Sequence, residues 1–266
     1  MLRLSLWNMP FRVVMEYTIS SFELSTDSCS ANTTGIVPLG RSHFWRHFGT
    51  LATMSSPIIV HRGFEAYEAT FAAMRAFTDA RTPETGDECW IVEHAPVFTL
   101  GLGADPSHVL DPRGIPVIQT DRGGEVTYHG PGQAIVYLLI DLRRHKAGGR
   151  LLAREFVHRI EQAVIDVLAA YNLEGRRKPG APGIYIANGR REGAKIAALG
   201  LKVRGNGCTY HGVALNVAMD LAPFSYINPC GYEGLATVDM KTMGVEVSLQ
   251  EAQSALAHRL ATLLAH

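Results

Sequence analysis

Apolar residues recur every three to four positions in three stretches of the chain, and this spacing predicts three helices. The first is expected to end near Ala80, with these residues on one face: Phe64, Tyr67, Phe71, Met74 and Phe77. The second is expected from about residue 150 to 171, with this apolar face: Leu152, Phe156, Ile160, Val164 and Val167. The third should reach His266, and it begins after Ser248, which forms a capping-box pattern with Glu251.

Shorter apolar runs predict strands between these helices, at residues 57–61, 89–93, 116–120, 133–140, 184–187, 194–203 and 208–219. The run 133–140 is almost entirely apolar and should be buried on both faces. Asn188-Gly189 separates two of the runs and is a strong signal for a two-residue hairpin turn. Because both helices and hairpins join the strands, we expect a mixed-sheet α/β or α+β domain. A doubly wound nucleotide fold is not expected, since neither GxGxxG after a strand nor GxxxxGK[ST] occurs.

Residues 1–53 differ from the rest of the chain. Nine of the 17 residues from Thr18 to Thr34 are Ser or Thr, and no apolar period persists. We therefore expect a disordered extension over 1–56 and one domain over 57–266. The extension lacks the unbroken apolar core of a secretory signal. A cytoplasmic bacterial protein is expected, or a mitochondrial matrix protein if 1–53 is a presequence, against which Glu16, Glu23 and Asp27 argue. Another alternative is that translation starts at Met54.

Composition excludes several classes of function. Lys+Arg and Asp+Glu both number 25, so the chain lacks the basic excess of a nucleic-acid binder held by bulk charge. A local docking patch for an acidic partner does not show in that total. The apolar run 134–140 is far shorter than the roughly 20 residues that span a membrane. The four cysteines form no CxxC and no Cys/His zinc pattern, so no metal site and a reducing compartment are expected.

One segment combines glycine with polar residues immediately before the apolar run 133–140. Residues 121–133 contain four glycines among Arg122, Tyr128 and His129. Glycines allow a close approach of backbone to a ligand and leave N–H groups available as donors. A plain glycine-rich connection is the alternative interpretation. The three polar side chains favour a binding site.

Two further features indicate chemistry. Lys195 lies in the small-residue run 192–200, where a lysine is commonly exposed on a sheet edge. If it faces a cleft instead, loss of water disfavours its charged form and makes it a usable base. The tetrapeptide Thr-Tyr-His-Gly occurs at 127–130 and again at 209–212. Each copy precedes an apolar stretch that ends in Asp-Leu, so we expect two similar strand entries lining one cleft.

The cysteines differ in their surroundings. Cys89 and Cys208 stand beside apolar strand residues, which predicts buried structural thiols, and Cys29 lies in the extension. Cys230 stands in a Pro-Cys-Gly turn, where a thiol is exposed. It needs a cationic neighbour to become a good nucleophile, and Lys195 is a candidate. Residue types alone leave other pairings open.

Four motifs, in this order and spacing, closely resemble the lipoate-biosynthesis octanoyltransferases: RGGEVTYHGPGQ, GAKIAALG, HGVALN and INPCGYEG. The likeness extends to VEHAPVFT at 92–99 and PGAPGIY at 179–185. It runs from about Ile58 to the C-terminus and leaves out only the extension.

The resemblance implies the catalytic fold of biotin and lipoate protein ligases, without ATP or another cofactor. It implies transfer of octanoyl from octanoyl-acyl carrier protein to a lysine of lipoyl domains, as the first step of endogenous protein lipoylation. The acceptors would be 2-oxoacid dehydrogenases and the glycine-cleavage H protein, with no nucleic acid or membrane as partner. Cys230 would carry the acyl thioester, and Lys195 would favour its thiolate. The implied substrate contacts are Arg122, Gly123, Gly124, Glu125, Val126, Thr127, Tyr128, His129, Ala198, Leu199, Gly200, Gly212, Val213 and Ala214.

Two other functions compete with this one. An ATP-dependent lipoate or biotin ligase of the same fold needs no nucleophilic cysteine, so Cys230 in its Asn-Pro-Cys-Gly turn argues against it. A non-catalytic acyl-carrier-binding or scaffold protein needs neither Cys230 nor Lys195. ATP dependence of amide formation and acylation of Cys230 discriminate among the three.

Overall fold

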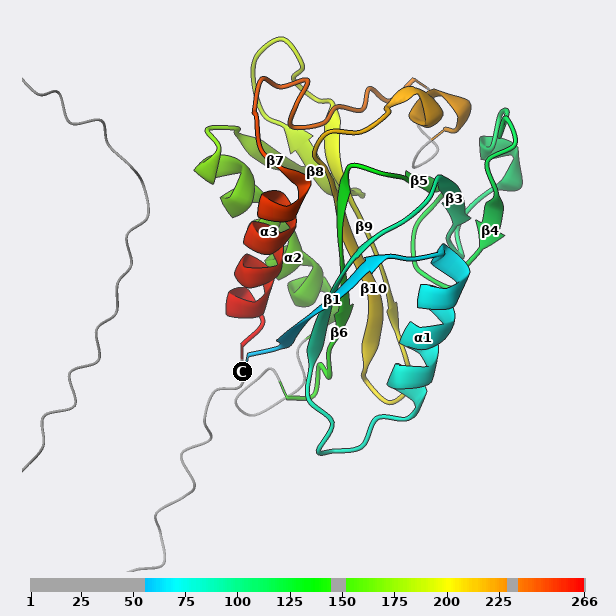
Figure 1. Ribbon diagram of the computed structural model, residues 1–266, viewed down its shortest axis with the longest axis vertical. Coiled ribbons are helices and arrows are strands. Elements are labelled where there is room, and N and C mark those ends of the chain that lie inside the picture. Colours follow the sequence, from blue (N-terminus) through cyan, green and yellow to red (C-terminus); the bar gives the residue numbers. More distant parts are fainter. Residues whose placement is uncertain (1–55, 145–151, 229–233, 266) are drawn as a thin grey trace, which may run out of the picture. The chain divides into compact units, whose positions relative to one another are not determined.

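A seven-stranded mixed sheet is the centre of the protein, whose computed structural model describes residues 56–144, 152–228 and 234–265 (Figure 1). The strand order is β1-β2-β6-β10-β9-β8-β7. β1 (Ile58–Phe64) runs parallel to β2 (Glu88–Glu93), and the other neighbouring pairs are antiparallel. The remaining strands are β6 (Gln133–Leu139), β7 (Gly175–Lys178), β8 (Ala181–Ile186), β9 (Lys195–Val203) and β10 (Thr209–Asn216).

A second sheet of three strands has the order β4-β3-β5. β3 (Val97–Leu100) pairs parallel with β4 (Val117–Gln119) and antiparallel with β5 (Thr127–His129). Two 3-10 helices accompany it, η1 (Pro106–His108) and η2 (Ala222–Tyr226). Its small core includes Phe98, Tyr128 and Phe224. This sheet therefore anchors both ends of the loop 120–126, between β4 and β5.

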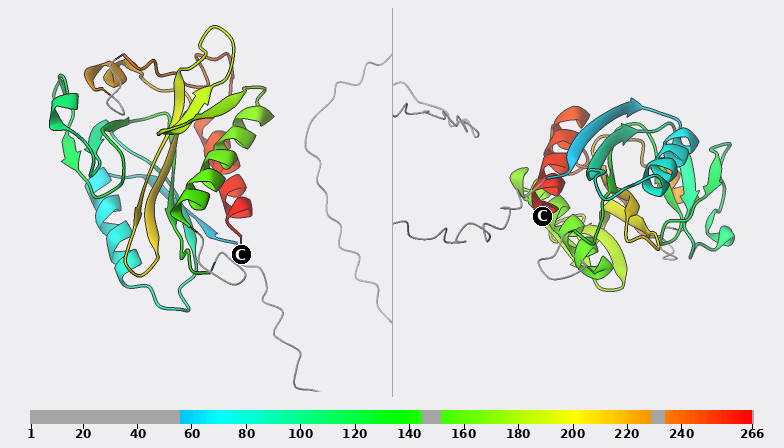
Figure 2. Two further views of the ribbon diagram at one scale, coloured as in Figure 1. Left: turned by 180° about the vertical axis from the view of Figure 1, so that it is seen from behind. Right: turned by 90° about the horizontal axis from the view of Figure 1, so that it is seen from below.

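Helices cover both faces of the large sheet. α2 (Ala153–Ala170) and α3 (Leu249–Leu263) lie on one face, and α1 (Tyr67–Asp79) lies on the other (Figures 1 and 2). Successive residues of β6 enter the two layers in turn. Val136 and Leu138 join the core under α2 and α3, and Ile135 and Tyr137 join the core under α1. All seven residues of β6 are buried, which confirms that prediction.

The predicted mixed-sheet α+β architecture and the capping box of α3 are confirmed. There Ser248 Oγ accepts a hydrogen bond from the Glu251 N–H at 3.2 Å, and the Glu251 carboxylate accepts one from the Ser248 N–H at 3.0 Å. β8 and β9 do pair antiparallel, but residues 187–194 connect them, so the predicted two-residue turn at Asn188-Gly189 was wrong. Residues 1–55 lie outside the described part of the chain, so the predicted extension stays a prediction. No helix among the described residues is long and apolar enough to cross a membrane.

Two further predictions of local structure were wrong. Phe64 shares the helical spacing of α1 but belongs to β1, where it pairs with Glu93 and is 62% exposed. Ladder bonds to β2, including Glu65 N–H to the Glu93 carbonyl at 3.0 Å, hold this residue out of the helix. β3, β5 and β7 were not predicted. β7 is Gly-Arg-Arg-Lys and has no apolar residue, so only its pairing with β8 makes it a strand.

Candidate functional site

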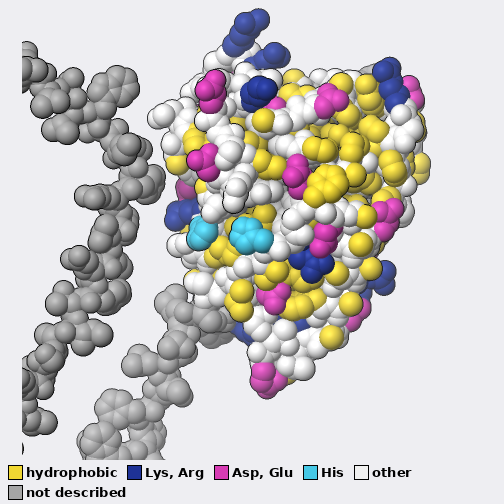
Figure 3. Space-filling model, in the orientation of Figure 1, with side chains coloured by type: hydrophobic (Ala, Val, Ile, Leu, Met, Phe, Trp, Pro, Cys, Tyr) yellow, Lys and Arg dark blue, Asp and Glu magenta, His cyan; other side chains and the backbone are white. Residues whose placement is uncertain are grey.

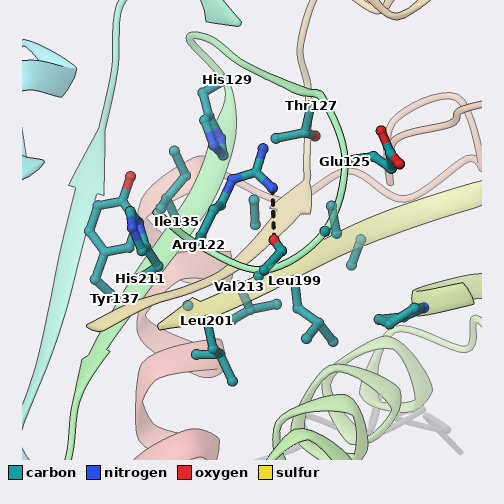
Figure 4. A pocket seen from close by; sticks show the side chains of 18 of the residues that line it. Arg122, Glu125, Thr127, His129, Ile135, Tyr137, Leu199, Leu201, His211 and Val213 are labelled. Carbon is teal, nitrogen blue, oxygen red and sulfur yellow. Dashed lines mark hydrogen bonds between the residues drawn. The ribbon is translucent and has the colours of Figure 1, made fainter. Parts of the chain in front are cut away.

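A cavity of about 310 Å³ lies between the glycine-rich loop and the strands β9 and β10 (Figure 4). Thirteen of the fourteen residues that the resemblance identified as substrate contacts line it, although they come from three separate segments. Tyr128 does not line it, because its ring packs against Phe98 and Phe224 in the core of the second sheet. The structure thus brings the loop 122–127 over the strand segments 198–200 and 212–214.

Small residues form the floor of the cavity. Gly212 pairs across the strands with Gly200, and Ala214 pairs with Ala198. Directly opposite residues of an antiparallel pair share a face, so these four positions form one shallow patch. A Cβ built on Gly200 would lie 3.1 Å from the Gly123 carbonyl oxygen, which shows that this face points to the loop. Larger side chains at Ala198 or Ala214 would take up space in the cavity, whereas a Cβ on Gly212 would lie 2.0 Å from the Val136 carbonyl oxygen of β6.

Arg122 holds the glycine-rich loop in place. Its guanidinium is buried and donates to the carbonyl of Thr99 at 2.6 Å, to the Thr99 hydroxyl at 2.9 Å and to the carbonyl of Gly123 at 3.0 Å. The Gly123 N–H also donates to the Leu201 carbonyl on β9 at 2.8 Å. A charged donor that makes several bonds to backbone gives a strong clamp. The loop is therefore fixed both to β3 and to β9.

Lys195 begins β9, an inner strand, and is only 7% exposed, so the interpretation as an exposed edge lysine was wrong. Its ammonium donates to the Pro182 carbonyl at 3.1 Å and lies 5.6 Å from the centre of the Tyr185 ring. Gly183 makes room for it, since a Cβ there would lie 2.7 Å from the Lys195 Cε. The sequence Pro182-Gly183 thus fixes the lysine in the cavity wall.

The chain that follows residue 233 also reaches Lys195. The Lys195 N–H donates to the Ala236 carbonyl at 2.8 Å, and the Val238 N–H donates to the Lys195 carbonyl at 2.9 Å. Thr237, between them, lines the cavity, as does Phe224 before the gap. Cys230 itself lies outside the described residues, so its position relative to Lys195 stays a prediction.

A row of buried amides connects the glycine-rich segment with this region. His129 Nδ1 lies 2.8 Å from Gln133 Oε1, and Gln133 Nε2 donates to Asn216 Oδ1 at 2.9 Å. Asn216 Nδ2 in turn donates to the Val238 carbonyl at 3.0 Å. Since Gln133 Oε1 can only accept, the row places the proton of His129 on Nδ1. The network fixes the tautomer of His129 and joins it to the segment that pairs with Lys195.

Aromatic and histidine rings form the opposite end of the cavity. His211 pairs with Leu201, six residues along β9 from Lys195, or about 20 Å at ~3.3 Å per residue. Tyr137 and His211 lie together at that end in Figure 4. The His211 ring stacks on Phe71 of α1 at 5.2 Å. His211 also has φ of 60°, a left-handed conformation that is uncommon for residues other than glycine and often marks functional sites.

Burial favours the neutral forms of the histidines at the His211 end of the cavity, whereas Asp121 there is ionised. Burial lowers the pKa of His129 to about 3, helped by the nearby His94, so His129 is neutral at pH 7. Burial also lowers the pKa values of His94 and His211. Asp121 is the exception: desolvation opposes its ionisation, but hydrogen bonds from His211 and Tyr210 outweigh it and lower its pKa to about 2. Within the described ranges, no group of three or more His, Cys, Asp or Glu side chains is arranged to hold a metal ion.

Cys89 and Cys208 are buried thiols, as predicted. Burial, with a smaller effect of Asp87, raises the pKa of Cys89 to about 12, and burial raises that of Cys208 as well. Both are therefore protonated and poor nucleophiles at neutral pH. Among the described cysteines none is suited to covalent chemistry.

Sequence reasoning missed several residues of the cavity wall, including Tyr67, Tyr137, Pro182 and His211. His211 could have been found, because it belongs to the second Thr-Tyr-His-Gly copy. Pro182 stands in the segment 179–185, which matched the family but was given no role. Tyr67 and Tyr137 fit an apolar helix face and an apolar strand, so no sequence signal separates them from core residues.

Comparisons with known proteins agree with this geometry. Residues 66–261 match the family model described as lipoyl protein ligase A/B catalytic domain. The octanoyltransferase of Janthinobacterium sp. (strain Marseille) is 71% identical over 214 residues, which are 80% of this chain and 99% of the relative. That of Herminiimonas arsenicoxydans is 68% identical over 210 residues, 79% of this chain and 97% of the relative.

Solved structures share the fold at low sequence identity. Lipoate-protein ligase A bound with ATP has a TM-score of 0.63 at 16% identity, covering 79% of this chain and 86% of that one. The bi-partite lipoate protein ligase of Thermoplasma acidophilum has a TM-score of 0.64 at 16% identity, covering 79% and 84%. These similarities confirm the predicted biotin/lipoate ligase-like fold.

Replacement of Gly183 by Ala should displace the Lys195 side chain. Gly183 has φ of 127°, and the added Cβ would contact the Lys195 Cε and the Ala197 carbonyl, so strain of about 1–3 kcal/mol is expected. Amine acylation followed by peptide mass spectrometry should show Lys195 modified severalfold faster in the variant. Lys178, exposed in the same chain, is the internal control. Unchanged labelling of Lys195 in a folded variant would contradict the assigned contact.

Proposed function

The chain belongs to the lipoyl protein ligase A/B catalytic-domain family, and within it to the octanoyltransferases, and from this we propose that it moves octanoyl through a thioester on Cys230. The donor is an octanoyl-acyl carrier protein. The acceptor is a lysine of lipoyl domains, such as those of 2-oxoacid dehydrogenases and the glycine-cleavage H protein. We place the reaction in the bacterial cytoplasm.

One observation carries the proposal: a buried lysine is fixed in the wall of a cavity with a small-residue floor. Lys195 is held by Pro182 and borders the segment 236–238. Cys230 stands six residues before Ala236, and Phe224, six residues before Cys230, also lines the cavity. This supports a thiol that works beside Lys195.

In the first step, the Cys230 thiolate attacks the carbonyl carbon of the donor thioester. The new carbon–sulfur bond forms to Cys230 and the bond to the carrier sulfur breaks. The carrier leaves as a thiol with the proton that cationic Lys195 gives up, which leaves Lys195 neutral. One thioester replaces another, so the exchange is nearly balanced in free energy. The cationic form of Lys195 favours the thiolate that attacks.

In the second step, the lysine amine of the acceptor attacks the acyl carbon. The acceptor ammonium first loses one proton to water, and the neutral amine loses a second as the carbon–nitrogen bond forms. The Cys230 sulfur leaves as the thiolate. Neutral Lys195 accepts one proton as a general base. An amide is more stable than a thioester, so this step needs no ATP.

The acyl chain fits between the glycine-rich loop and the floor formed by Ala198, Gly200, Gly212 and Ala214. Burial of a methylene contributes about 0.8 kcal/mol, so seven carbons beyond the carbonyl contribute up to about 5 kcal/mol. The fixed loop gives the cavity a defined depth. The far end is closed by the rings around His211 and Tyr137.

Replacement of Cys230 by Ser should abolish the stable acyl-enzyme, because an alcohol lacks the nucleophilicity of a thiolate near neutral pH. Intact-mass analysis after incubation with octanoyl-acyl carrier protein should show one octanoyl adduct on the wild type and none on the variant. Cys89→Ser is the matched control and should still acylate. An adduct that persists in C230S, or maps to Cys208, would refute the proposal.

Replacement of Lys195 by Ala should slow both steps if Lys195 has both roles. Acylation should recover at high pH, with its midpoint moved toward about 8.5, the value of an ordinary thiol. Transfer from pre-acylated enzyme should fall by about 10²–10⁴, the usual loss of a general base. Lys195→Arg should fail in both steps, since a guanidinium does not give up its proton. Single-turnover measurement of each half-reaction checks this, and normal transfer from acylated K195A would rule out the base role.

Replacement of Ala198 by Leu should shorten the acyl chain that the enzyme prefers. The larger side chain fills the floor, and each excluded methylene loses about 0.8 kcal/mol, or about fourfold in kcat/KM. The measurement compares octanoyl, hexanoyl and butyryl carrier substrates. Ala72→Leu, which adds the same atoms on the exposed face of α1, should leave the order of preference unchanged. An unaltered preference in A198L would mean that the chain binds elsewhere.

A further inference from the structure

Positive charge is concentrated in one exposed segment of an otherwise neutral chain. Residues 174–192 contain five Lys or Arg and two Glu, whereas the whole chain has equal numbers of basic and acidic residues. Four of the five are exposed, and we call them the basic edge: Arg176, Lys178, Arg190 and Arg191. The fifth, Arg177, is bound to Glu161 and Gln162 on α2 and is not part of it.

The basic edge comes from two neighbouring elements. Arg176 and Lys178 belong to β7, the last strand of the sheet, and Arg190 and Arg191 lie in the loop between β8 and β9. In the space-filling view, Lys and Arg side chains gather over that loop at the top of the molecule (Figure 3). Glu192 lies 3.2 Å from Arg176, but both side chains are about half exposed, and such a pair is worth little in water.

This surface adjoins Lys195. In the sheet, Arg176 pairs with Tyr185, and Tyr185 pairs with Lys195. The ammonium of Lys178 lies 5.7 Å from the centre of the Tyr185 ring, and that of Lys195 lies 5.6 Å from the same centre. Pro182, which accepts the hydrogen bond from Lys195, is itself exposed. The basic edge therefore begins where the cavity wall around Lys195 meets the surface.

The basic residues at the other end of β9 are placed differently. Arg204 forms an ion pair with Asp79 at 2.7 Å, and Lys202 lies in the same surface hollow as Asp79. Both stand near the β9–β10 turn, many residues along the strand from Lys195. The basic edge differs from these residues because it lies beside Lys195.

We propose that the basic edge is the docking surface for the donor and that it attracts the phosphodiester of the carrier's phosphopantetheine arm and the acidic surface around it. The inference rests on the proposed function, because it takes the donor to be a carrier protein. The arm must bring its thioester to the Lys195 end of the cavity while its anionic phosphate stays outside. Opposite charges steer such an encounter and raise its rate.

The charge also separates the donor from the acceptor. The acceptor presents a lysine, which arrives as a cation and gains nothing from four further positive charges. The donor arm is an anion and gains attraction at each of them. The basic edge is therefore assigned to the donor, and the acceptor is expected to approach over another part of the cavity mouth.

The test uses charge reversal in the full chain. The variants are Arg190→Glu/Arg191→Glu, confined to the exposed loop, and Arg176→Glu/Lys178→Glu, confined to β7. Each is assayed with two donors, octanoyl-acyl carrier protein and octanoyl-pantetheine, which lacks the phosphate and the carrier. The quantity compared is the ratio of kcat/KM for the carrier donor to kcat/KM for the pantetheine donor.

The ratio should fall by about 10- to 100-fold in each double variant, within the range of electrostatic steering. The wild-type ratio should itself fall as salt is added, because salt screens the attraction between exposed charges. Arg75→Glu reverses an equally exposed charge on α1, on the other side of the sheet, and should keep the wild-type ratio. Thermal unfolding identifies any variant that fails to fold. If one double variant does not fold, the ratio of the other double variant tests the inference.

Two results would overturn the inference. One is an unchanged ratio in both folded double variants, and if KM for the lipoyl-domain acceptor then rises, the surface belongs to the acceptor. The other is a fall in R75E equal to that in the double variants. The proposed function fails in a different way, because wild-type enzyme would then form no Cys230-dependent adduct from either donor.

Discussion

The site depends on one clamp, the bonds that Arg122 makes to β3 while the loop backbone bonds to β9. The Gly123 N–H and the Leu201 carbonyl join the loop to the large sheet, and the guanidinium joins it to Thr99. These bonds hold the loop at a fixed distance from the small-residue floor. The clamp also explains Gly101, where a Cβ would lie 2.0 Å from the Gly124 carbonyl oxygen. A cavity of defined depth exists because two sheets are tied together across it.

The two ends of that cavity are chemically different. At one end, the Lys195 amine is held in the wall by the Pro182 carbonyl and the Tyr185 ring. At the other end, burial keeps His129 neutral, and His211 contacts ionised Asp121. An acyl carbonyl that reacts beside Lys195 thus has its polar chemistry at one end and its hydrocarbon tail directed away from it. Side-chain hydrogen bonds from His129 through Gln133 and Asn216 to the Val238 carbonyl join the two ends.

The surface outside the cavity has a charge distribution of its own. A chain of zero formal charge carries four exposed basic residues beside Lys195, on an edge strand and the loop next to it. An edge strand rich in Arg and Lys resists pairing with other chains, so the same residues also protect the edge of the sheet. Protection against aggregation and attraction of an anionic donor arm are compatible uses of one surface.

The sequence by itself determined the element types and the list of chemical groups. Apolar periodicity predicted α1, α2, α3 and the buried β6, because those patterns are local, and the ordered motifs identified Lys195 and the glycine-rich loop as belonging to one family. Phe64, β5 and β7 were decided only by tertiary structure, since pairing with a distant strand outweighed local spacing. The contact of Lys195 with Pro182, the clamp between Arg122 and Thr99, and the inclusion of Tyr67 and His211 were also decided there. Each of these joins residues far apart in the chain, and a linear pattern contains no information about which distant backbone carbonyl or ring a side chain will meet.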